Sequence, residues 1–590
     1  MVSGVAKPHV LLSTEGTYPF HLGGVSTWCD TLVHQLPDIH FDIFAIAMNP
    51  YVSLRYAMPA NVGQVIPVPL WGMQDPSEHR TDVIYSEIFL QKQRTDGEHV
   101  RALFLPPFQQ FLRGLAGALP PGELGQALAA MYRYFRTYDY QVSFKTEQVW
   151  EVFKEWELQA AHRGLWDEPS VFEAVQSIGW IYHFLTVLNT SIPHVDVVHS
   201  SAAAFCGMVG IVSKLEYGTP YVLTEHGVYL REQYLSIGRS SMTPFSKRFL
   251  LALVKTIAKE NLFYADELAP VCAFNGRWER VLGADPDKIR VIYNGVSSER
   301  FFPTALPDAA PPGSLVHVLA VARIDPNKDL VTLLRAMAIV KNFGISAKTV
   351  IQGSVSVPEY ADKLEKLLRE LGLEREVEFS GHTDDMTAVY RDADIVVQSS
   401  VTEAFPYSVI EAMMSGRPMV ATDVGGTREA LGDAGILVPS RDPALLAAGI
   451  AMLATNPALR RELGVLARAR AVEKFEIRQT LAAFTDLYRR WSQRAPKVMG
   501  TGRANAQPEA VLRLQRAHAL RALNQPLLAL EQCALALDMV GSSPAATTLL
   551  LEMVDLEWRL GRLRQAEEHL IKAKMLEAFF AERGGLGQVG

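Results

Sequence analysis

The sequence predicts an α/β protein in which two Rossmann-like domains face a cleft. Strand-like apolar segments alternate with amphipathic helical segments in two separate parts of the chain, and a glycine-containing loop follows the first strand candidate. A proline-rich stretch lies between the two parts. With 590 residues the chain is also too long for a single hydrophobic core, because such cores stop growing near about 250–300 residues.

The first domain is expected over residues 1–302. Residues 10–12 predict its first strand, the following loop contains Gly23 and Gly24, and an apolar-periodic helix comes next. Residues from about 51 to 192 contain long amphipathic stretches rich in aromatic side chains, which predict a large helical insertion. Further strands of this domain are expected at residues 41–47, 195–199, 220–226 and 288–296.

The second domain is expected over residues 314–476, after an interdomain linker at residues 303–313 that carries four prolines. A helix at residues 477–495 is expected to cross over and pack back on the first domain. Intervening segments of about 10–20 residues suit helical crossovers between parallel strands. The strands are expected at residues 316–321, 348–353, 377–381, 395–399, 418–422 and 435–438.

A helical C-terminal appendix is expected at residues 503–590, after a polar hinge at residues 494–507. Residues 522–531 resemble residues 559–568 at an offset of 37, which is close to the tetratricopeptide (TPR) period. Two readings stay open for this TPR-like segment: a module that binds a partner protein, or a helical hairpin that shields the catalytic body.

Charge and cysteine content exclude some function classes. The net charge is 57 − 64 = −7, so no global attraction to nucleic acid or to an anionic membrane is expected. The four cysteines are scattered without metal-ligand spacing, which favours a reducing cytoplasm. The N-terminal segment lacks a signal-peptide pattern, and the longest apolar stretch, residues 202–212, is shorter than the ~20 residues of a membrane span.

The strongest candidate for a ligand-binding segment begins at Glu403 and ends at Glu411. An apolar strand precedes them, Pro406 suits a first helical turn, and the free N–H groups of a helix start can bind a diphosphate. If Glu403 precedes the helix, the two carboxylates are about 10–12 Å apart at 1.5 Å per residue, close to the span from the sugar to the ribose of a nucleotide-sugar. A structural role for both glutamates remains the alternative.

The residues around this pair resemble the signature of glycosyltransferase family 4. The resemblance covers roughly residues 8–495 and rests on EAFPYSVIEAMMSGRP at 403–418, ATDVGGTRE at 421–429, VARIDPNKDL at 321–330 and YNGV at 293–296. EGTYPFHLGGVSTW at 15–28 and TEHGVYLRE at 224–232 are similar to the PelF-type branch, the cytoplasmic glycosyltransferases of the pellicle polysaccharide. The resemblance implies a GT-B fold and a nucleotide-sugar donor.

This resemblance also implies roles for individual residues on the donor side. Arg323 and Lys328 are expected to hold the donor diphosphate, together with Gly23 and Gly24, whose small size lets the loop approach the ligand. Glu411 is expected to bind the ribose, and Glu403 and His226 are expected to be catalytic residues beside the transferred sugar. The backbone of Ala404, Phe405, Pro406 and Tyr407 is expected to contact the sugar and the phosphate. The nucleobase is expected near Gly353, Gly381 and His382, and further candidates are Arg231, Glu232 and Asn294.

The expected reaction is retaining hexosyl transfer from a UDP-sugar such as UDP-glucose to a growing polysaccharide or other glycan acceptor, with no cofactor and no metal. The aspartate pairs Asp285/Asp287 and Asp392/Asp394 precede strand candidates and do not resemble a metal-binding loop. Leu22 replaces an arginine of the PelF-type pattern, so the acceptor and pathway can differ from pellicle synthesis.

Three alternatives stay open at the level of sequence. The chain could be a starch- or glycogen-synthase-like transferase that uses an ADP-sugar, or a nucleotide-dependent epimerase with the same donor site. It could also be a scaffold subunit whose C-terminal helices recruit membrane-bound polysaccharide synthase proteins. The expected location is cytoplasmic, with contact to the inner membrane through such partners and no nucleic-acid partner.

Overall fold

The computed structural model describes residues 7–80, 82–83, 85–303, 314–495, 517, 526–540, 544–560 and 562–584. The chain separates into two compact units, Met1–Ala495 and Pro496–Gly590. The predicted proline-rich linker, apart from its first residue, and the predicted hinge beyond residue 495 lie outside the described residues.

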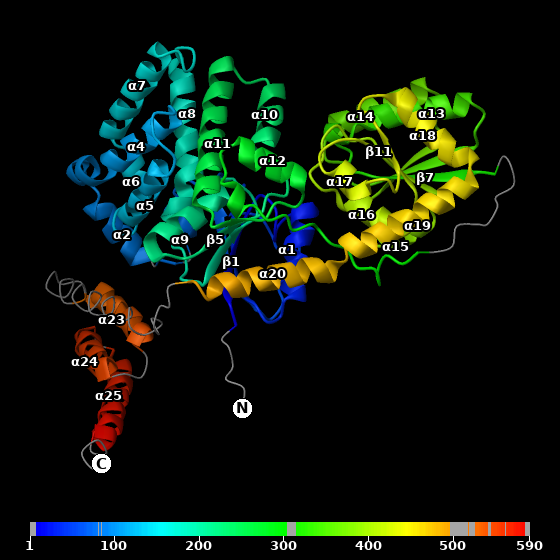
Figure 1. Ribbon diagram of the computed structural model, residues 1–590. Helices are drawn as coiled ribbons and strands as arrows, with labels where there is room; N and C mark the ends of the chain where they lie inside the picture. Colours follow the sequence, from blue (N-terminus) through cyan, green and yellow to red (C-terminus); the bar gives the residue numbers. More distant parts are fainter. Residues whose placement is uncertain are drawn as a thin grey trace. The chain divides into compact units, whose positions relative to one another are not determined.

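The first sheet has six parallel strands in the order β3-β2-β1-β4-β5-β6. Figure 1 labels two of them, β1 and β5. The central strands of this sheet are almost entirely buried, as expected for a parallel sheet covered on both faces. The strands are β1 (His9–Glu15), β2 (His40–Ala47), β3 (Val62–Pro69), β4 (Val197–Ser200), β5 (Tyr221–Leu223) and β6 (Glu267–Leu268).

The second sheet also has six parallel strands, in the order β12-β11-β10-β7-β8-β9. They are β7 (Val316–Val321), β8 (Ala347–Gln352), β9 (Val377–Gly381), β10 (Ile395–Gln398), β11 (Met419–Thr422) and β12 (Ile436–Val438). Both sheets therefore have the doubly wound order in which the chain reverses direction beside the first strand, and ligands bind outside the carboxyl ends of the strands at that point. The predicted fold class of two Rossmann-like domains is confirmed.

Helices complete the two α/β domains. Those of the first domain are α1 (Gly24–Gln35), η4 (Phe205–Gly207), α9 (Met208–Tyr217), α10 (Tyr229–Arg239), α11 (Pro244–Tyr264), α12 (Ala273–Val281) and η5 (Pro286–Lys288). Those of the second are η6 (Pro326–Lys328), α13 (Leu330–Asn342), α14 (Pro358–Glu370), α15 (Met386–Arg391), α16 (Tyr407–Met414), α17 (Thr427–Leu431), α18 (Pro443–Thr455) and α19 (Pro457–Lys474).

The helical insertion lies between β3 and β4, so its predicted start near residue 51 is wrong. β3 occupies Val62–Pro69 inside the predicted range. Pro67 and Pro69 weaken the strand pattern in the sequence, but β3 is an edge strand, where proline is tolerated. The insertion consists of η1 (Pro76–His79), α2 (Tyr85–Arg94), α3 (Gly97–His99), the π-helical turn η2 (Val100–Phe104), α4 (Leu105–Leu115), α5 (Glu123–Phe135), α6 (Tyr140–Phe144), α7 (Glu147–His162), α8 (Val171–Phe184) and η3 (Leu185–Asn189).

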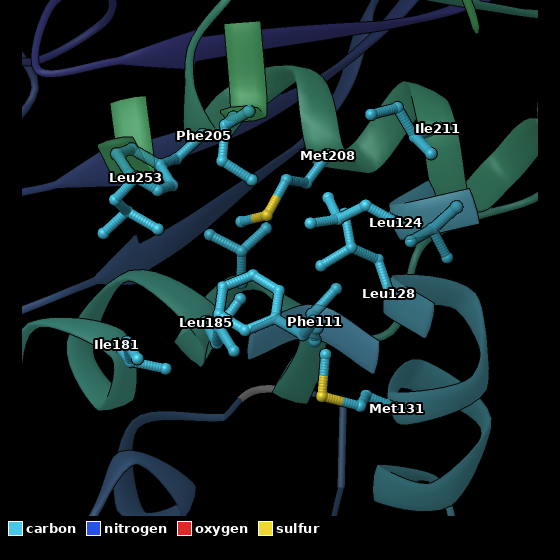
Figure 2. Packing of buried hydrophobic residues seen from close by; sticks show 14 of the residues in the cluster. Phe111, Leu124, Leu128, Met131, Ile181, Leu185, Phe205, Met208, Ile211 and Leu253 are labelled. Atoms are coloured by element: carbon cyan, nitrogen blue, oxygen red, sulfur yellow. The ribbon is translucent and has the colours of Figure 1, made fainter. Parts of the chain in front are cut away.

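The insertion shares one hydrophobic core with the first domain. In α4, Leu105, Phe108, Leu112 and Leu115 are buried at the three- and four-residue spacing of one helix face. Figure 2 shows how side chains of the insertion meet those of η4, α9 and α11, among them Phe111, Leu128, Met131, Phe205, Met208 and Leu253. Among the described residues, one helical stretch, Val171–Asn189, is long and apolar enough to span a membrane by length and composition.

The last strand of the first sheet differs from the predicted one. Residues 288–296 were expected to form a strand, but they hold only isolated bridges, from Ile289 to Leu268 and from Val296 to Glu476. The sixth strand is the two-residue β6, whose Glu267 is buried and carries no strand signal in the sequence. The prediction of a strand at 288–296 is therefore wrong, because that segment runs beside β6 as an extended connection.

Helix α20 (Ile477–Ser492) leaves the second domain and packs on the first sheet. Its Tyr488 hydroxyl lies 2.7 Å from Nδ1 of His199 on β4. Arg490 and Trp491 both donate to the Glu267 carboxylate on β6, at 2.9 Å and 2.7 Å. The buried faces of α20 and β1, β2 and β4 form one core, which joins the two domains.

The second unit contains three described helices, α23 (Pro526–Val540), α24 (Pro544–Arg559) and α25 (Leu563–Gly584). They pack in sequence through apolar positions such as Cys533, Leu556 and Ala573. His569 on α25 lies 2.8 Å from the buried Glu557 carboxylate on α24. Both of the similar sequence segments, 522–531 and 559–568, fall partly outside the described residues.

Candidate active site

A cleft of about 1000 Å³ opens at the carboxyl ends of the strands of both sheets. Its lining combines residues of the loops that follow β1, β5, β7, β8, β9 and β10. Most of the sequence-predicted positions lie in this wall: Gly23, Gly24, His226, Glu232, Asn294, Arg323, Lys328, Gly353, His382, Glu403, Ala404, Phe405, Pro406 and Tyr407. Glu411, Gly381 and Arg231 do not line the cleft, although Gly381 and Arg231 are hydrogen-bonded to the lining residues Gly353 and Thr402.

The glycine pair of the first domain lies at the start of α1. Gly23 is the N-cap residue of this helix, and a Cβ atom built on it would meet nothing within 4 Å. A Cβ on Gly24 would come within 3.8 Å of the Tyr407 ring across the cleft. The absence of side chains here leaves the N-terminus of α1 open toward the second domain. A helix N-terminus favours a bound anion. Leu22, at the position of the arginine of the resembled pattern, is 63% exposed and lines the same cleft.

Two cations reach the cleft from the loop after β7. Asp325 caps the short helix η6 by accepting a hydrogen bond from Asn327 N, and this turn fixes Lys328 at its end. Lys328 Nζ lies 2.6 Å from Oε1 of Glu403. Arg323 is exposed, and no hydrogen-bond acceptor or carboxylate of the described residues holds its guanidinium. Arg323 is therefore free to bind an anion, while Lys328 is paired.

The segment 403–408 forms the second-domain wall and ends in the start of α16. Pro406 is the N-cap residue of α16, so the first N–H groups of the helix face the cleft at Tyr407 and Ser408. Asn294 Nδ2 donates to the Phe405 carbonyl at 3.2 Å. These contacts hold the backbone at the helix start, a local geometry suited to phosphate oxygens.

A glycine that the sequence predictions left without a role fixes this wall from behind. Gly425 has φ +59, and a Cβ atom there would be 1.7 Å from the Glu403 carbonyl oxygen. The next residue, Gly426, donates its N–H to the Ala404 carbonyl at 2.7 Å. Both the left-handed backbone and the close approach require glycine at position 425.

Glu411 lies one turn along α16, behind the cleft wall. The Tyr390 hydroxyl donates to its Oε2 at 2.9 Å. Burial is the main cause that raises the pKa of the Glu411 carboxyl, while the Tyr390 hydrogen bond and the charge of Arg300 act in the opposite direction. The tyrosine thus fixes the direction of the carboxylate, and the sequence alone did not show this partner.

His226 follows β5 and lies at the base of the cleft. Its ring packs edge-on against Trp28, with 4.4 Å between ring centroids. Burial lowers the pKa of His226 to about 3, so the imidazole is neutral at ordinary pH. Its Nε2 atom is buried and has no hydrogen-bond partner among the described residues. A ligand hydroxyl or phosphate could satisfy this nitrogen, because buried polar atoms are normally paired.

Helix α10 carries two further candidates beside the cleft. Arg231 donates from Nη1 to the Thr402 hydroxyl in the loop after β10, so it ties the two domains together instead of lining the cleft. Glu232 lines the cleft and lies against Gly227, where a Cβ atom would be 1.9 Å from its Oε1. Burial raises the pKa of Glu232 and nearby Glu403 adds to this, whereas Arg231 and Lys328 oppose it.

The candidate nucleobase positions lie where β8 and β9 end. A Cβ atom on Gly353 would be 2.1 Å from the Ala322 carbonyl, so this backbone approach requires glycine. Gly381 does not line the cleft; its carbonyl accepts hydrogen bonds from Gly353 N at 2.8 Å and Gln352 Nε2 at 2.5 Å. His382 lines the cleft, and its Nε2 lies 3.2 Å from Asp384 Oδ1.

Sequence reasoning assigned no role to a carboxyl group at the end of β1. Glu15 accepts hydrogen bonds from Cys206 N at 3.0 Å and from the Tyr229 hydroxyl at 3.4 Å. Burial raises the pKa of Glu15 to about 7. Tyr229 is the first residue of α10, so Glu15 braces the helix that carries Glu232. Its position at the end of the first strand is the signal available in the sequence.

Within the described residues, one group of three side chains has the donor atoms and spacing for a metal ion: His9, His40 and Asp42, whose ligand atoms lie within 4.8 Å of one another. They lie on β1 and β2 and do not line the cleft. Of the two aspartate pairs, Asp285 caps η5 and Asp394 accepts a hydrogen bond from His317 N at 2.9 Å. These two aspartates have structural partners.

Comparison with known proteins places this geometry in a family. Residues 308–470 match the profile described as glycosyl transferases group 1, and residues 8–287 match a domain of unknown function, DUF3492. The chain is 19% identical to the solved sucrose-phosphate synthase from Thermosynechococcus elongatus, with a TM-score of 0.52 over 82% of this chain and 98% of that one, which shows a shared fold.

Curated relatives give the sequence relationship. A D-inositol 3-phosphate glycosyltransferase from Saccharomonospora viridis is 30% identical over 315 residues, which are 50% of this chain and 70% of that enzyme. D-inositol 3-phosphate glycosyltransferase 2 from Catenulispora acidiphila is 30% identical over 323 residues, 52% of this chain and 74% of that enzyme. With such relatives and a matching profile over its second domain, the chain belongs to the group 1 glycosyltransferases.

Proposed function

We propose that this glycosyltransferase moves a hexosyl group from a UDP-sugar, such as UDP-glucose, to a growing polysaccharide or other glycan acceptor, with retention of configuration and without a required metal ion. One observation carries the proposal. The unpaired Arg323, the Lys328 ammonium and the open start of α16 meet in one cleft, opposite the Gly23–Gly24 start of α1. Two cations and two helix N-termini together suit a diphosphate.

In the proposed complex, the diphosphate binds Arg323, Lys328 and the N–H groups at the start of α16. The transferred sugar lies between His226 and Glu403, with its hydroxyls near the backbone of residues 404–407. Glu411, oriented by Tyr390, binds the ribose, and the base lies by Gly353 and His382, with Gly381 behind them. The support for this orientation is that these groups follow different strands and still line or adjoin one cleft.

The reaction proposed for this site breaks the bond between the anomeric carbon and the donor phosphate oxygen. The acceptor hydroxyl oxygen attacks the same face of the anomeric carbon, and its proton moves to the departing phosphate oxygen. Arg323 and Lys328 stabilise the negative charge that grows on the leaving diphosphate, which is electrostatic preorganisation toward the transition state. Glu403 orients the donor and stabilises positive character in the sugar ring.

The decisive experiment follows donor turnover and product configuration by NMR. Arg323→Ala is expected to lower turnover by 100-fold or more, whereas Arg369→Ala, which removes an exposed arginine from α14 in the same domain, leaves it unchanged. Binding of UDP, GDP and ADP in parallel distinguishes the proposed donor from the ADP-sugar alternative, and EDTA treatment tests metal independence. Full turnover by a folded Arg323→Ala protein, or an inverted product, contradicts the proposal.

We further propose that the chain is a PelF-type enzyme located in the cytoplasm and that its C-terminal unit recruits membrane-bound polysaccharide synthase proteins. The supporting observation is that several large apolar side chains of this unit are exposed, Trp558 and Leu563 most of all, at 68% and 58%. Removing the residues after 503 should spare donor binding and abolish association with the partner. Retained association by the shortened protein would exclude this role for the unit.

A further inference from the structure

A second cavity, of about 380 Å³, lies beside the cleft and has a basic lining. Three arginines from separate parts of the chain contribute to it: Arg239 at the end of α10, Arg335 on α13 and Arg441 just before α18. Arg239 and Pro326 line both the cavity and the cleft. The cavity and the cleft therefore share part of their walls.

The three guanidinium groups have no carboxylate at ion-pair distance among the residues that the structure describes. Arg239 Nη1 donates to Asn327 Oδ1 at 3.2 Å, and no acceptor of the described residues holds Arg335 or Arg441. Asp329 also lines the cavity, but its carboxylate is engaged as the N-cap of α13, where it accepts hydrogen bonds from the Thr332 hydroxyl at 2.7 Å and from Thr332 N. The cavity lining therefore carries three arginine charges against the single Asp329 carboxylate, a net positive excess.

Arg441 is unfavourably placed in two further ways. Its backbone is left-handed, with φ 62, a conformation that residues other than glycine and asparagine rarely adopt. It also precedes Asp442, the N-cap residue of α18, so its positive charge lies near the positive end of that helix dipole. Strained, uncompensated residues of this kind are concentrated at ligand sites.

We propose that this cavity binds a carboxylate or phosphate group of the glycan acceptor, so that the enzyme selects acidic acceptors. The inference rests on the proposed function. Arginine suits this task because its planar fork of donors matches carboxylate and phosphate oxygens. The donor diphosphate has its own cations, Arg323 and Lys328, within the cleft. An anion held in the adjoining cavity is therefore assigned to the second substrate.

Binding of labelled oligosaccharides to the full-length protein tests the proposal. The probes are an oligomer of uronic acid residues, a glucose oligomer of the same length and inorganic phosphate. The test variant combines Arg335→Gln with Arg441→Asn, because asparagine tolerates the left-handed backbone. The matched control combines Arg369→Gln with Arg375→Gln, which removes two exposed positive charges from the same domain outside the cavity.

The test variant is expected to bind the acidic oligomer at least 10-fold more weakly at low salt, with no change for the neutral oligomer. The control should bind both like the unaltered protein, and Arg441→Lys should retain most of the acidic binding. Donor hydrolysis without acceptor should be equal in all variants; its absence in the unaltered protein would count against the proposed function instead. Equal acidic binding by the test variant, or phosphate binding that the acidic oligomer does not displace, overturns the proposal.

Discussion

The ammonium nitrogen of Lys328 lies 2.6 Å from Oε1 of Glu403. The residue expected to bind the donor diphosphate and the residue expected to contact the transferred sugar therefore form an ion pair in the cleft wall. Ser400 Oγ donates to the same carboxylate oxygen, also at 2.6 Å. The side chains are 23% and 10% exposed, so the pair is largely shielded from solvent. A bound diphosphate would compete with Glu403 for this ammonium group.

Removing Lys328 should weaken donor binding, and neutralising Glu403 should not. Lys328→Ala loses one charge-assisted hydrogen bond to the donor, worth about 1.5–3 kcal/mol, so UDP affinity should fall roughly 10- to 100-fold. In Glu403→Gln the ammonium group no longer has a carboxylate competitor, so UDP should bind as well or better while sugar transfer falls. Calorimetric titration with UDP and turnover assays separate the two effects. Weaker UDP binding by Glu403→Gln than by Lys328→Ala would show that the pair has a different role.

Tyr390→Phe tests whether Glu411 binds the ribose. The substitution removes the 2.9 Å hydrogen bond that directs the carboxylate and leaves the ring in place. A lost hydrogen bond to a charged acceptor is worth about 1.5–3 kcal/mol at most, so we expect the donor KM to rise about 5- to 50-fold with little change in kcat. Steady-state kinetics with varied donor concentration measure both constants.

Tyr360→Phe is the matched control for that substitution. Tyr360 lies on α14 in the same domain, is 9% exposed and does not line the cleft. Removal of its hydroxyl should leave the donor KM unchanged. If both variants had the same donor KM, Glu411 would not depend on Tyr390 for its orientation.

The imidazole of His226 should act as a neutral hydrogen-bond donor or acceptor. With its pKa lowered to about 3, it contributes no limb to the pH–rate profile between pH 5 and 8. His226→Phe should lower kcat/KM by about 10- to 100-fold, the cost of one or two hydrogen bonds to a charged transition state, and should leave the shape of the profile unchanged. A limb near pH 6.5 that disappears in His226→Phe would show that the group titrates during catalysis.

The fold could be predicted largely from sequence because both sheets consist of parallel strands buried on both faces. Such strands give apolar runs, as at residues 43–47 or 395–397. Short or edge strands lack this signal. β3 contains two prolines and β6 has only two residues, one of them the buried Glu267, so neither stands out before the structure is known.

The candidate site could be predicted residue by residue where a motif carries the chemistry, but the partners of those residues come from distant parts of the chain. Tyr390 reaches Glu411 from α15, and Arg231 reaches Thr402 from the other domain. The basic cavity shows the same limitation, since Arg239, Arg335 and Arg441 are far apart in sequence. Tertiary packing alone brings such groups together.

Two buried glutamates should make the stability of the protein depend on pH. Burial raises the pKa of Glu15 to about 7 and that of Glu157, in the helical insertion, to about 7 as well. The unfolded chain releases these protons near pH 4.5, so between pH 4.5 and 7 the folded state holds protons that the unfolded state has lost. The free energy of unfolding therefore falls as pH rises through this window, by up to about 3 kcal/mol for each group, and this loss is complete above pH 7.

Glu15→Gln and Glu157→Gln should each remove one such contribution, so each variant gains stability relative to the unaltered protein as the pH rises from 5 to 8. Urea unfolding at several pH values measures this difference. Glu157 accepts a hydrogen bond from Ser177 within the insertion and lies outside the cleft wall, so its variant should keep the unaltered pH–rate profile. Glu15 braces α10 through Tyr229, so Glu15→Gln should also change the pH–rate profile near pH 7. Identical rate profiles for the two variants, together with the expected stability changes, would show that Glu15 has no influence on the cleft.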